Sequence, residues 1–282
     1  MSDEKSKATL LKEEIMMKGS KGAATLNAEE IKKADDFCVG YKKFLDHSPV
    51  EREAVSYTLE LAKKAGFTEY DENASYNAGD KVYYVNRDKA IALAVIGKNG
   101  VKNGARLAIA HIDSPRIDLK PNPLYEDTNL ALFKTHYYGG LKKYQWTALP
   151  LSLHGTVVKL DGTKVNITWG DDENESCFCV TDLLPHLAKD QVSKPLAKVF
   201  TGEDLNVLVG SRPYEDGNDE KDLVKLNVMS ILNKKYGIVE GDFLSAELCL
   251  IPSFKARDIG FDASMIGGYG HDDKVCAYPA LM

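Results

Sequence analysis

A run of apolar residues that ends in a polar cluster restricts the possible folds of this chain more than any other feature. Residues 107–110 (Leu-Ala-Ile-Ala) lead directly into His111, and Asp113 follows two positions later. An apolar run without polar interruption predicts a strand buried on both faces, which ends at Pro115 because proline cannot donate to a ladder. His111 and Asp113 would then lie at the carboxyl end of an interior strand, where open α/β sheets bind ligands.

His111 and Asp113 are also expected to share one pocket. Side chains alternate along a strand, so positions 111 and 113 point to the same side. This arrangement suits a metal-binding histidine whose tautomer is fixed by an acidic partner. The alternative is a polar strand end capped by an Asx turn, and the His-x-Asp spacing alone leaves that alternative open.

Composition limits the class of protein. A chain of 282 residues predicts two domains, or one domain carrying an insertion. The net charge of -6 argues against nucleic acid as a partner and shows no polybasic patch for a membrane. The charged start leads into no signal-peptide core, so we expect a cytoplasmic protein. Five scattered cysteines imply no disulfide framework, and Cys177-Phe178-Cys179 is a poor zinc signature.

Periodicity and turn residues predict most of the remaining elements. They are a helix at 28–46, a helix that Ser48 caps and that ends at Gly66, hairpins at 81–97 and 151–169, and a helix that begins near 223 and ends near Gly237. The short strands between 130 and 169 have no helices between them, which indicates a β-rich module inserted into an α/β domain. His136 and His154 lie on these strands and are interpreted as structural residues, because they lack ligand spacing.

A second polar cluster lies near the end of the sequence. Gly267, Gly268 and Gly270 permit close backbone approach, and His271-Asp272-Asp273 follows at what reads as the start of a helix. A carboxylate at this position is also favoured by the helix dipole, so Asp272, taken alone, is better explained as a helix cap.

Motifs in one fixed order connect these clusters to a known family. They are His111-Ile112-Asp113-Ser114-Pro115, Lys120-Pro121, Tyr138-Gly139-Gly140, Leu151-x-Leu153-x-Gly155 and Gly270-His271-Asp272-Asp273-Lys274-Val275-Cys276. The ordered set resembles the aspartyl aminopeptidase (aminopeptidase I) family of dinuclear zinc metallo-exopeptidases. The resemblance extends from about Lys12 to Met282 and is far more specific than any single motif.

The resemblance implies a fold and a division into domains. The fold is α/β, with a mixed sheet sandwiched by helices as in zinc exopeptidases and with an inserted β-rich dimerisation domain. We expect the first part of the catalytic domain at 1–118, the inserted domain at 119–252 and the second part of the catalytic domain at 253–282, incomplete at its C-terminus.

The resemblance also implies roles for four residues. His111 corresponds to the first metal ligand, and Asp113 to the catalytic-site acid that supports it. Asp272 corresponds to the carboxylate that bridges two metals, with Asp273 as the second choice. His186 lies near the position of a histidine that reaches into a partner subunit's active site and contacts substrate, although the family's usual histidine falls closer to Asp190.

The implied activity is that of a zinc-dependent aminopeptidase. It would use two zinc ions per complete site, with cobalt or manganese as possible substitutes, and would act on peptides with a free N-terminus. A homodimer that builds a larger homo-oligomer is implied as well. Residues 146–151 (Trp-Thr-Ala-Leu-Pro-Leu) depart from the Trp-Phe-Asp-Arg-Asp-Leu found in many members, so a preference for N-terminal aspartate does not carry over.

The number of ligands gives a further expectation. Two zinc ions need about four to five ligands each, and this sequence offers one imidazole and one bridging carboxylate. Glu240 and Glu247 have no ligand spacing and are expected to be solvated. The chain is therefore expected to be the amino-terminal part of an enzyme. Two other interpretations remain: a catalytically silent subunit or scaffold of the same fold, and a metallohydrolase that acts on acylated amino acids.

Overall fold

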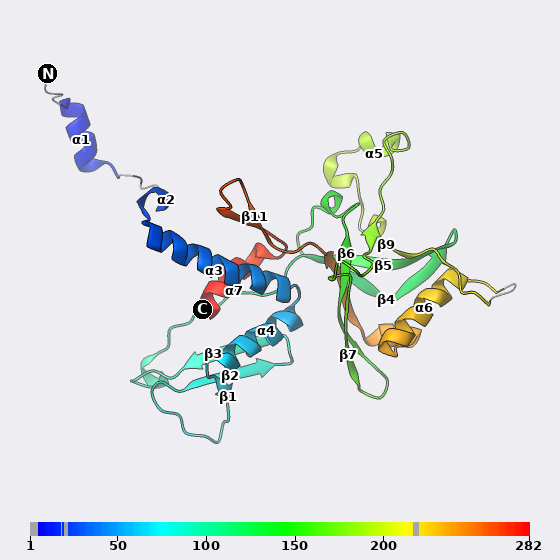
Figure 1. Ribbon diagram of the computed structural model, residues 1–282, viewed down its shortest axis with the longest axis horizontal. Coiled ribbons are helices and arrows are strands. Elements are labelled where there is room, and N and C mark those ends of the chain that lie inside the picture. Colours follow the sequence, from blue (N-terminus) through cyan, green and yellow to red (C-terminus); the bar gives the residue numbers. More distant parts are fainter. Residues whose placement is uncertain (1–4, 18, 20–21, 217–219) are drawn as a thin grey trace. The chain divides into compact units, whose positions relative to one another are not determined.

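The computed structural model describes residues 5–17, 19, 22–216 and 220–282 (Figure 1). The chain divides into two compact units, residues 1–41 and residues 42–282. The first unit contains α1 (Lys7–Ile15), which Ser6 caps by accepting a hydrogen bond from the Thr9 amide, and α2 (Gly22–Thr25). Helix α3 (Ala28–His47) begins in the first unit and ends in the second, so the helix predicted at 28–46 is confirmed.

In the second unit, α4 (Glu51–Lys64) lies against a small mixed sheet (Figure 1). The sheet consists of β1 (Thr68–Glu69), which runs parallel to β2 (Lys81–Asn86), and β3 (Ala90–Val95), which is antiparallel to β2. Arg87, Asp88 and Lys89 connect β2 to β3, with φ angles of 52° at Arg87 and 58° at Asp88, and the Lys89 amide donates a hydrogen bond of 3.0 Å to the Asn86 carbonyl, so the chain reverses in a tight turn. The predicted hairpin is therefore confirmed.

The predicted cap of α4 is wrong. Val50 is the N-cap residue of this helix and makes no side-chain cap hydrogen bond. Ser48 is fully buried, and its hydroxyl has no hydrogen-bond partner among the described residues. The helix begins at Glu51, two positions later than a cap at Ser48 requires.

The predicted interior strand that leads into His111 is also wrong. Residues 104–115 form no strand, and Leu107 and Ile109 are 78% and 84% exposed. In the part of the chain that the structure describes, β3 is the edge of its sheet and no strand pairs with this segment. An apolar run predicts a buried strand only where a pairing partner is within reach, and the sequence pattern does not report that.

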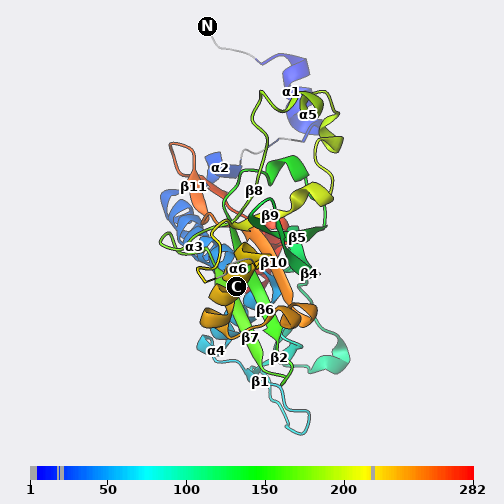
Figure 2. The same cartoon turned by 90° about the vertical axis from the view of Figure 1, so that its right-hand side faces the viewer.

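Seven antiparallel strands form the largest sheet of the second unit, in the order β7-β6-β10-β4-β5-β9-β8 (Figure 2). The strands are β4 (Arg116–Asp127), β5 (Leu130–Tyr138), β6 (Leu151–Val158), β7 (Lys164–Trp169), β8 (Cys179–Val180), β9 (Val207–Gly210) and β10 (Glu247–Pro252). The predicted hairpin at 151–169 is β6–β7, and Gly162 takes a φ of +85° in its turn. The β4–β5 register shifts between Leu119 and Leu124, where Pro121 and Pro123 remove two amide donors.

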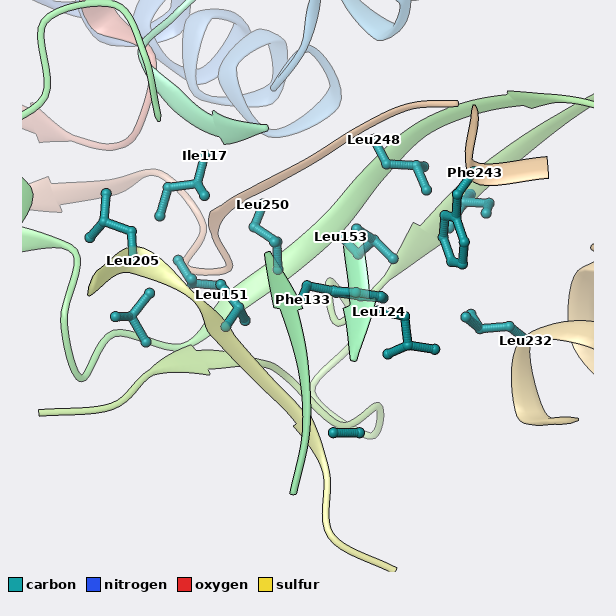
Figure 3. Close-up of a cluster of buried hydrophobic side chains, with 14 of the residues drawn as sticks. Ile117, Leu124, Phe133, Leu151, Leu153, Leu205, Leu232, Phe243, Leu248 and Leu250 are labelled. Atoms are coloured by element: carbon teal, nitrogen blue, oxygen red, sulfur yellow. The ribbon is translucent and has the colours of Figure 1, made fainter. Parts of the chain in front are cut away.

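The hydrophobic core lies on one face of this sheet. Figure 3 shows Leu153, Phe133 and Leu250 from three strands in one cluster with Leu232, which comes from α6 (Leu223–Tyr236). Each of these side chains is at least 94% buried, and burial of one such side chain stabilises the fold by roughly 1.5–3 kcal/mol. Helix α6 ends at Gly237 with a φ of 65°, as predicted.

Three further elements complete the second unit. They are the short helix α5 (Lys189–Val192), which lies between β8 and β9, the two-stranded sheet of β11 (Arg257–Ile259) and β12 (Met265–Gly267), and α7 (His271–Leu281). Tyr278 of α7 packs on Phe44 of α3, with ring centroids 5.3 Å apart. The predicted α/β class with a mixed sheet is confirmed.

Candidate metal centre

His111 and Asp113 lie in the extended segment that precedes β4. The Nδ1 atom of His111 is 3.0 Å from Oδ1 of Asp113, and the Tyr138 hydroxyl donates a hydrogen bond of 2.8 Å to Oδ2 of the same carboxylate. A carboxylate only accepts, so Nδ1 carries a proton and Nε2 is the nitrogen with a lone pair to offer. The expected pairing of His111 with Asp113 is present, although no strand holds it.

The contact between His111 and Asp113 shifts the pKa of both side chains toward their charged forms. Desolvation opposes the charged form of His111, but the charge and hydrogen bonds of Asp113 outweigh it, so the pKa of His111 is raised. Desolvation likewise opposes ionisation of Asp113, but hydrogen bonds from Tyr138, a backbone amide and His111 lower the pKa of its carboxyl group. Asp113 is therefore ionised at neutral pH and keeps the imidazole in one orientation.

Asp272 and Asp273 reach the same place from the start of α7. Gly270 precedes them with a φ of +87°, a left-handed conformation that favours glycine, and neither aspartate has helical backbone angles. The Asp272 side chain is 83% exposed, and no side chain makes a cap hydrogen bond at this helix. The alternative explanation of Asp272 as a helix cap is therefore not what the geometry shows.

His111, Asp272 and Asp273 each offer one ligand atom, and these atoms all lie within 4.8 Å of one another. The Nε2 atom of His111 is 3.3 Å from Oδ1 of Asp272. One imidazole nitrogen and two carboxylate oxygens are ligands that zinc accepts, and Asp113 on the other ring nitrogen is the usual outer partner of a metal-bound histidine. The donor set therefore fits a divalent cation. The two sequence clusters, more than 150 positions apart, meet in one site.

Ser114 and Lys274, which the sequence did not single out, connect the His111 segment to the start of α7. Ser114 donates a hydrogen bond of 3.0 Å to the Asp272 carbonyl, and Lys274 donates one of 2.8 Å to the Ser114 hydroxyl. Desolvation lowers the pKa of the buried Lys274 to about 8, against the pull of the carboxylates of Glu51 and Asp113. Both residues stand in the motifs quoted above, which was the one signal available for them.

The other candidates lie outside this cluster. His186 is exposed in the segment between β8 and α5 and is not part of the three-residue group. Glu240 pairs with Lys225, while Glu247 pairs with Arg52 and Lys89. These two glutamates act in surface ion pairs, and neither belongs to the group of His111, Asp272 and Asp273.

Comparison with known proteins identifies the family. The sequence profile of the aminopeptidase I zinc metalloprotease (M18) family matches residues 44–282. The chain belongs to the M18 family. A probable M18 family aminopeptidase 1 from Clostridium acetobutylicum is 52% identical over 245 residues, which cover 86% of this chain and 52% of that protein.

Solved structures agree with this M18 assignment. The crystal structure of an M18 aminopeptidase from Thermotoga maritima superimposes with a TM-score of 0.87 and 43% identity, over 94% of this chain and 57% of that chain. Aminopeptidase I from Borrelia burgdorferi B31 superimposes with a TM-score of 0.81 and 41% identity, over 91% and 58%. The family resemblance seen in the sequence is confirmed. The M18 chain spans about half the length of the relatives it matches.

One further observation concerns membranes. No helix among the described residues of this M18 chain combines the length and the apolar character that a membrane span requires.

Proposed function

We propose that this chain carries part of the active site of a zinc-dependent metallo-aminopeptidase, which hydrolyses single N-terminal residues from peptides with a free amino group. The observation that carries the proposal is the convergence of His111, Asp272 and Asp273 within 4.8 Å, in a chain of a zinc metalloprotease family. A zinc ion held by these residues would polarise a substrate carbonyl and lower the pKa of a water molecule.

The ligand roles follow from the donor atoms. His111 offers Nε2, because its Nδ1 proton is engaged by Asp113. Asp272 is proposed as the carboxylate shared by two metal ions, since its oxygen is 3.3 Å from the imidazole and its side chain is exposed; Asp273 is the second choice. Two ions per complete site, and cobalt or manganese as substitutes, remain part of the proposal and rest on the family resemblance.

Asp113 and Tyr138 act on the imidazole, not on the substrate. Tyr138 holds Oδ2 of Asp113 while His111 holds Oδ1, so the carboxylate cannot rotate without losing a hydrogen bond. A fixed Asp113 keeps the proton on Nδ1, and a histidine supported in this way is a stronger ligand.

The chain is also proposed to work as a homodimer that builds a larger homo-oligomer. The segment that carries His186 exposes several large aliphatic side chains, and a surface of this kind marks an interaction site. The most exposed are Leu184 (66%), Leu187 (70%), Val192 (79%) and Leu196 (60%). In such an assembly His186 would contact substrate in a partner's active site. Analytical ultracentrifugation that shows only monomer at micromolar concentration would contradict this part.

Domain boundaries at 118 and 252 are part of the same proposal. The seven strands of the large sheet fall between Arg116 and Pro252. Of the proposed ligands, His111 precedes this interval, and Asp272 and Asp273 follow it. Residues 1–118 and 253–282 would then form the catalytic part, with 119–252 as the β-rich dimerisation domain.

Zinc binding is the direct test. Titration of the metal-free chain with zinc should give saturable binding, and His111→Ala should weaken it at least about 100-fold, because one of few protein ligands is lost. His136→Ala is the matched control, since His136 is exposed and outside the ligand group. Equal zinc affinity of the His111→Ala variant and the wild type would refute the assignment.

Activity is tested on a chain of the relatives' full length. Free-amine aminoacyl arylamides should be hydrolysed and their N-acetyl forms should not. Hydrolysis of the N-acetyl forms alone would indicate a metallohydrolase for acylated amino acids. Zinc binding without hydrolysis of either substrate would indicate a silent subunit or scaffold.

A further inference from the structure

Lys274 is a fully buried lysine in the second unit and directly follows Asp273 in the chain. Its ammonium group donates hydrogen bonds to the Ser114 hydroxyl at 2.8 Å and to the Pro49 carbonyl at 3.2 Å. Lysine is almost never fully buried unless it is paired, because removing its charge from water costs free energy. The contacts of the Lys274 ammonium group should therefore show what this buried charge does in the fold.

The hydrogen bonds of Lys274 connect the two halves of the ligand cluster. Ser114, which accepts from Lys274, donates onward to the carbonyl of Asp272 at 3.0 Å. Ser114 is three residues after His111, and Asp272 is two residues before Lys274. The chain of contacts therefore fixes the His111 segment against the start of α7, and the bond to Pro49 anchors both to the turn that precedes α4.

The space around the ammonium is closely filled. A Cβ atom on Gly270 would lie 2.9 Å from the Lys274 nitrogen and 3.3 Å from the Ser114 hydroxyl, and the Tyr269 ring centroid is 5.8 Å from the same nitrogen. The lysine therefore has little freedom to move, and its position determines where Ser114 and the Asp272 carbonyl lie.

We propose that Lys274 is a positioning residue that sets the separation of His111 from Asp272 and Asp273, and so controls the affinity of the site for a divalent metal without touching it. The metal part of this inference rests on the proposed function. The structural part, that Lys274 holds the two ligand segments together, does not.

Metal affinity tests the first part. Lys274→Met keeps the length of the side chain and removes the three donors, and Ser114→Ala removes the middle link. Both should weaken zinc binding, Lys274→Met by about 10–100-fold, as loss of outer partners of metal ligands does. The visible spectrum of bound cobalt should also change. The double variant should bind about as weakly as Lys274→Met alone, because both substitutions break one connection.

Leu153→Ala is the matched control for simple destabilisation. Leu153 is buried in the core of the seven-stranded sheet, so this variant lowers the free energy of unfolding and should leave zinc affinity within about twofold of the wild type. Lys274→Met with wild-type zinc affinity and an unchanged cobalt spectrum would overturn the inference. If Lys274→Met does not fold, Ser114→Ala decides the same question.

Hydrogen exchange of the metal-free chain separates this inference from the proposed function. Lys274→Met should accelerate exchange of the amides at 111–116 and 270–276 together by about tenfold or more, whereas Leu153→Ala should accelerate exchange in the sheet. If the wild type binds no zinc and Lys274→Met still shows this joint acceleration, the metal site is refuted and the positioning role is kept. Exchange that changes in only one of the two segments overturns the positioning role.

Discussion

His111 and His154 have the same kind of partner on each ring nitrogen, because each imidazole lies between two carboxylates. They differ in exposure: the His111 side chain is 52% exposed and that of His154 is 1% exposed. An ion pair in water is worth little and can be exchanged for another partner, whereas breaking a buried pair leaves a charge without compensation. The same residue types thus make an exposed ligand site around His111 and a buried structural ion-pair cluster around His154. We call the second one, formed by His154, Glu53 and Asp171, the clamp.

The clamp joins three parts of the second unit. His154 on β6 contacts Glu53 of α4 at 2.9 Å and Asp171, which follows β7, at 3.1 Å; the Ser152 hydroxyl lies 3.0 Å away, and Lys255 is 3.8 Å from Asp171. Burial opposes the charged imidazole, but the hydrogen bonds and charges of the two carboxylates outweigh it and raise the pKa of His154 to about 9. His154 is therefore a cation at neutral pH, as a clamp between two anions needs.

His154→Ala should have the largest effect on stability. It leaves Glu53 and Asp171 partly buried without their cation, so we expect the free energy of unfolding to fall by about 3–5 kcal/mol. Urea denaturation at pH 7 measures this change, and His136→Ala should stay within about 0.5 kcal/mol of the wild type. The zinc affinity of the folded His154→Ala chain should be unchanged. A fall of less than about 1 kcal/mol would show that the two histidine sites differ less than their burial indicates.

The pH dependence of stability should separate the two sites next. The folded-state pKa of His154 is about 9, against 6.5 without the fold, so its stabilisation is complete below pH 6.5 and is lost as pH rises through 9. The difference in unfolding free energy between wild type and His154→Gln should shrink by about 3 kcal/mol over this interval. The pKa of Lys274 is lowered to about 8, so its effect on the free energy of unfolding is opposite: stability rises as the pH rises above 8. Lys274 is present in both the wild type and His154→Gln, so its effect cancels when the two unfolding free energies are subtracted. A difference that does not vary with pH would refute the charged clamp.

The surroundings of His154 were predicted correctly from the sequence, whereas those of His111 were predicted only in part. Turn residues such as Asp161-Gly162 are local signals, so the β-rich sheet that holds His154 was predicted with its hairpin. The proximity of His111 and Asp113 was also predicted, although from a strand that the structure does not contain. Residues two apart are neighbours in any extended segment, which is why the conclusion survived the error.

Long-range contacts explain what the sequence did not reveal. The bond from Lys274 to Ser114 spans 160 positions, and the bonds from His154 to Glu53 and from Lys274 to Pro49 span 101 and 225. No periodicity or turn rule relates residues so far apart. The convergence of His111 with Asp272 was expected only from the order of family motifs, so resemblance supplied what local patterns could not.

Asp113→Asn should sharpen the comparison at the open site. The amide can accept from His111 or donate to it, and this ambiguity removes the fixed tautomer, so zinc affinity should fall by about 10–100-fold. The free energy of unfolding without metal should change by less than about 0.5 kcal/mol, because the contact with His111 is solvent-exposed. Asp172→Asn, in an exposed turn, is the control for loss of one negative charge. A large loss of stability with unchanged zinc affinity would make His111 a second structural clamp.

Tyr138→Phe should have the smallest effect and the most specific meaning. The ring packs under the Arg116 guanidinium at 4.4 Å, and phenylalanine keeps that contact while removing the hydrogen bond to Oδ2 of Asp113. One hydrogen bond to a charged group contributes about 1.5–3 kcal/mol at most, and less when it is exposed, so zinc affinity should fall by about 3–10-fold. Asp113→Asn should then mask the effect of Tyr138→Phe in the double variant, because the hydroxyl acts only through that carboxylate. Additive losses, measured by competition with a chelator, would mean that Tyr138 reaches the metal centre by another route.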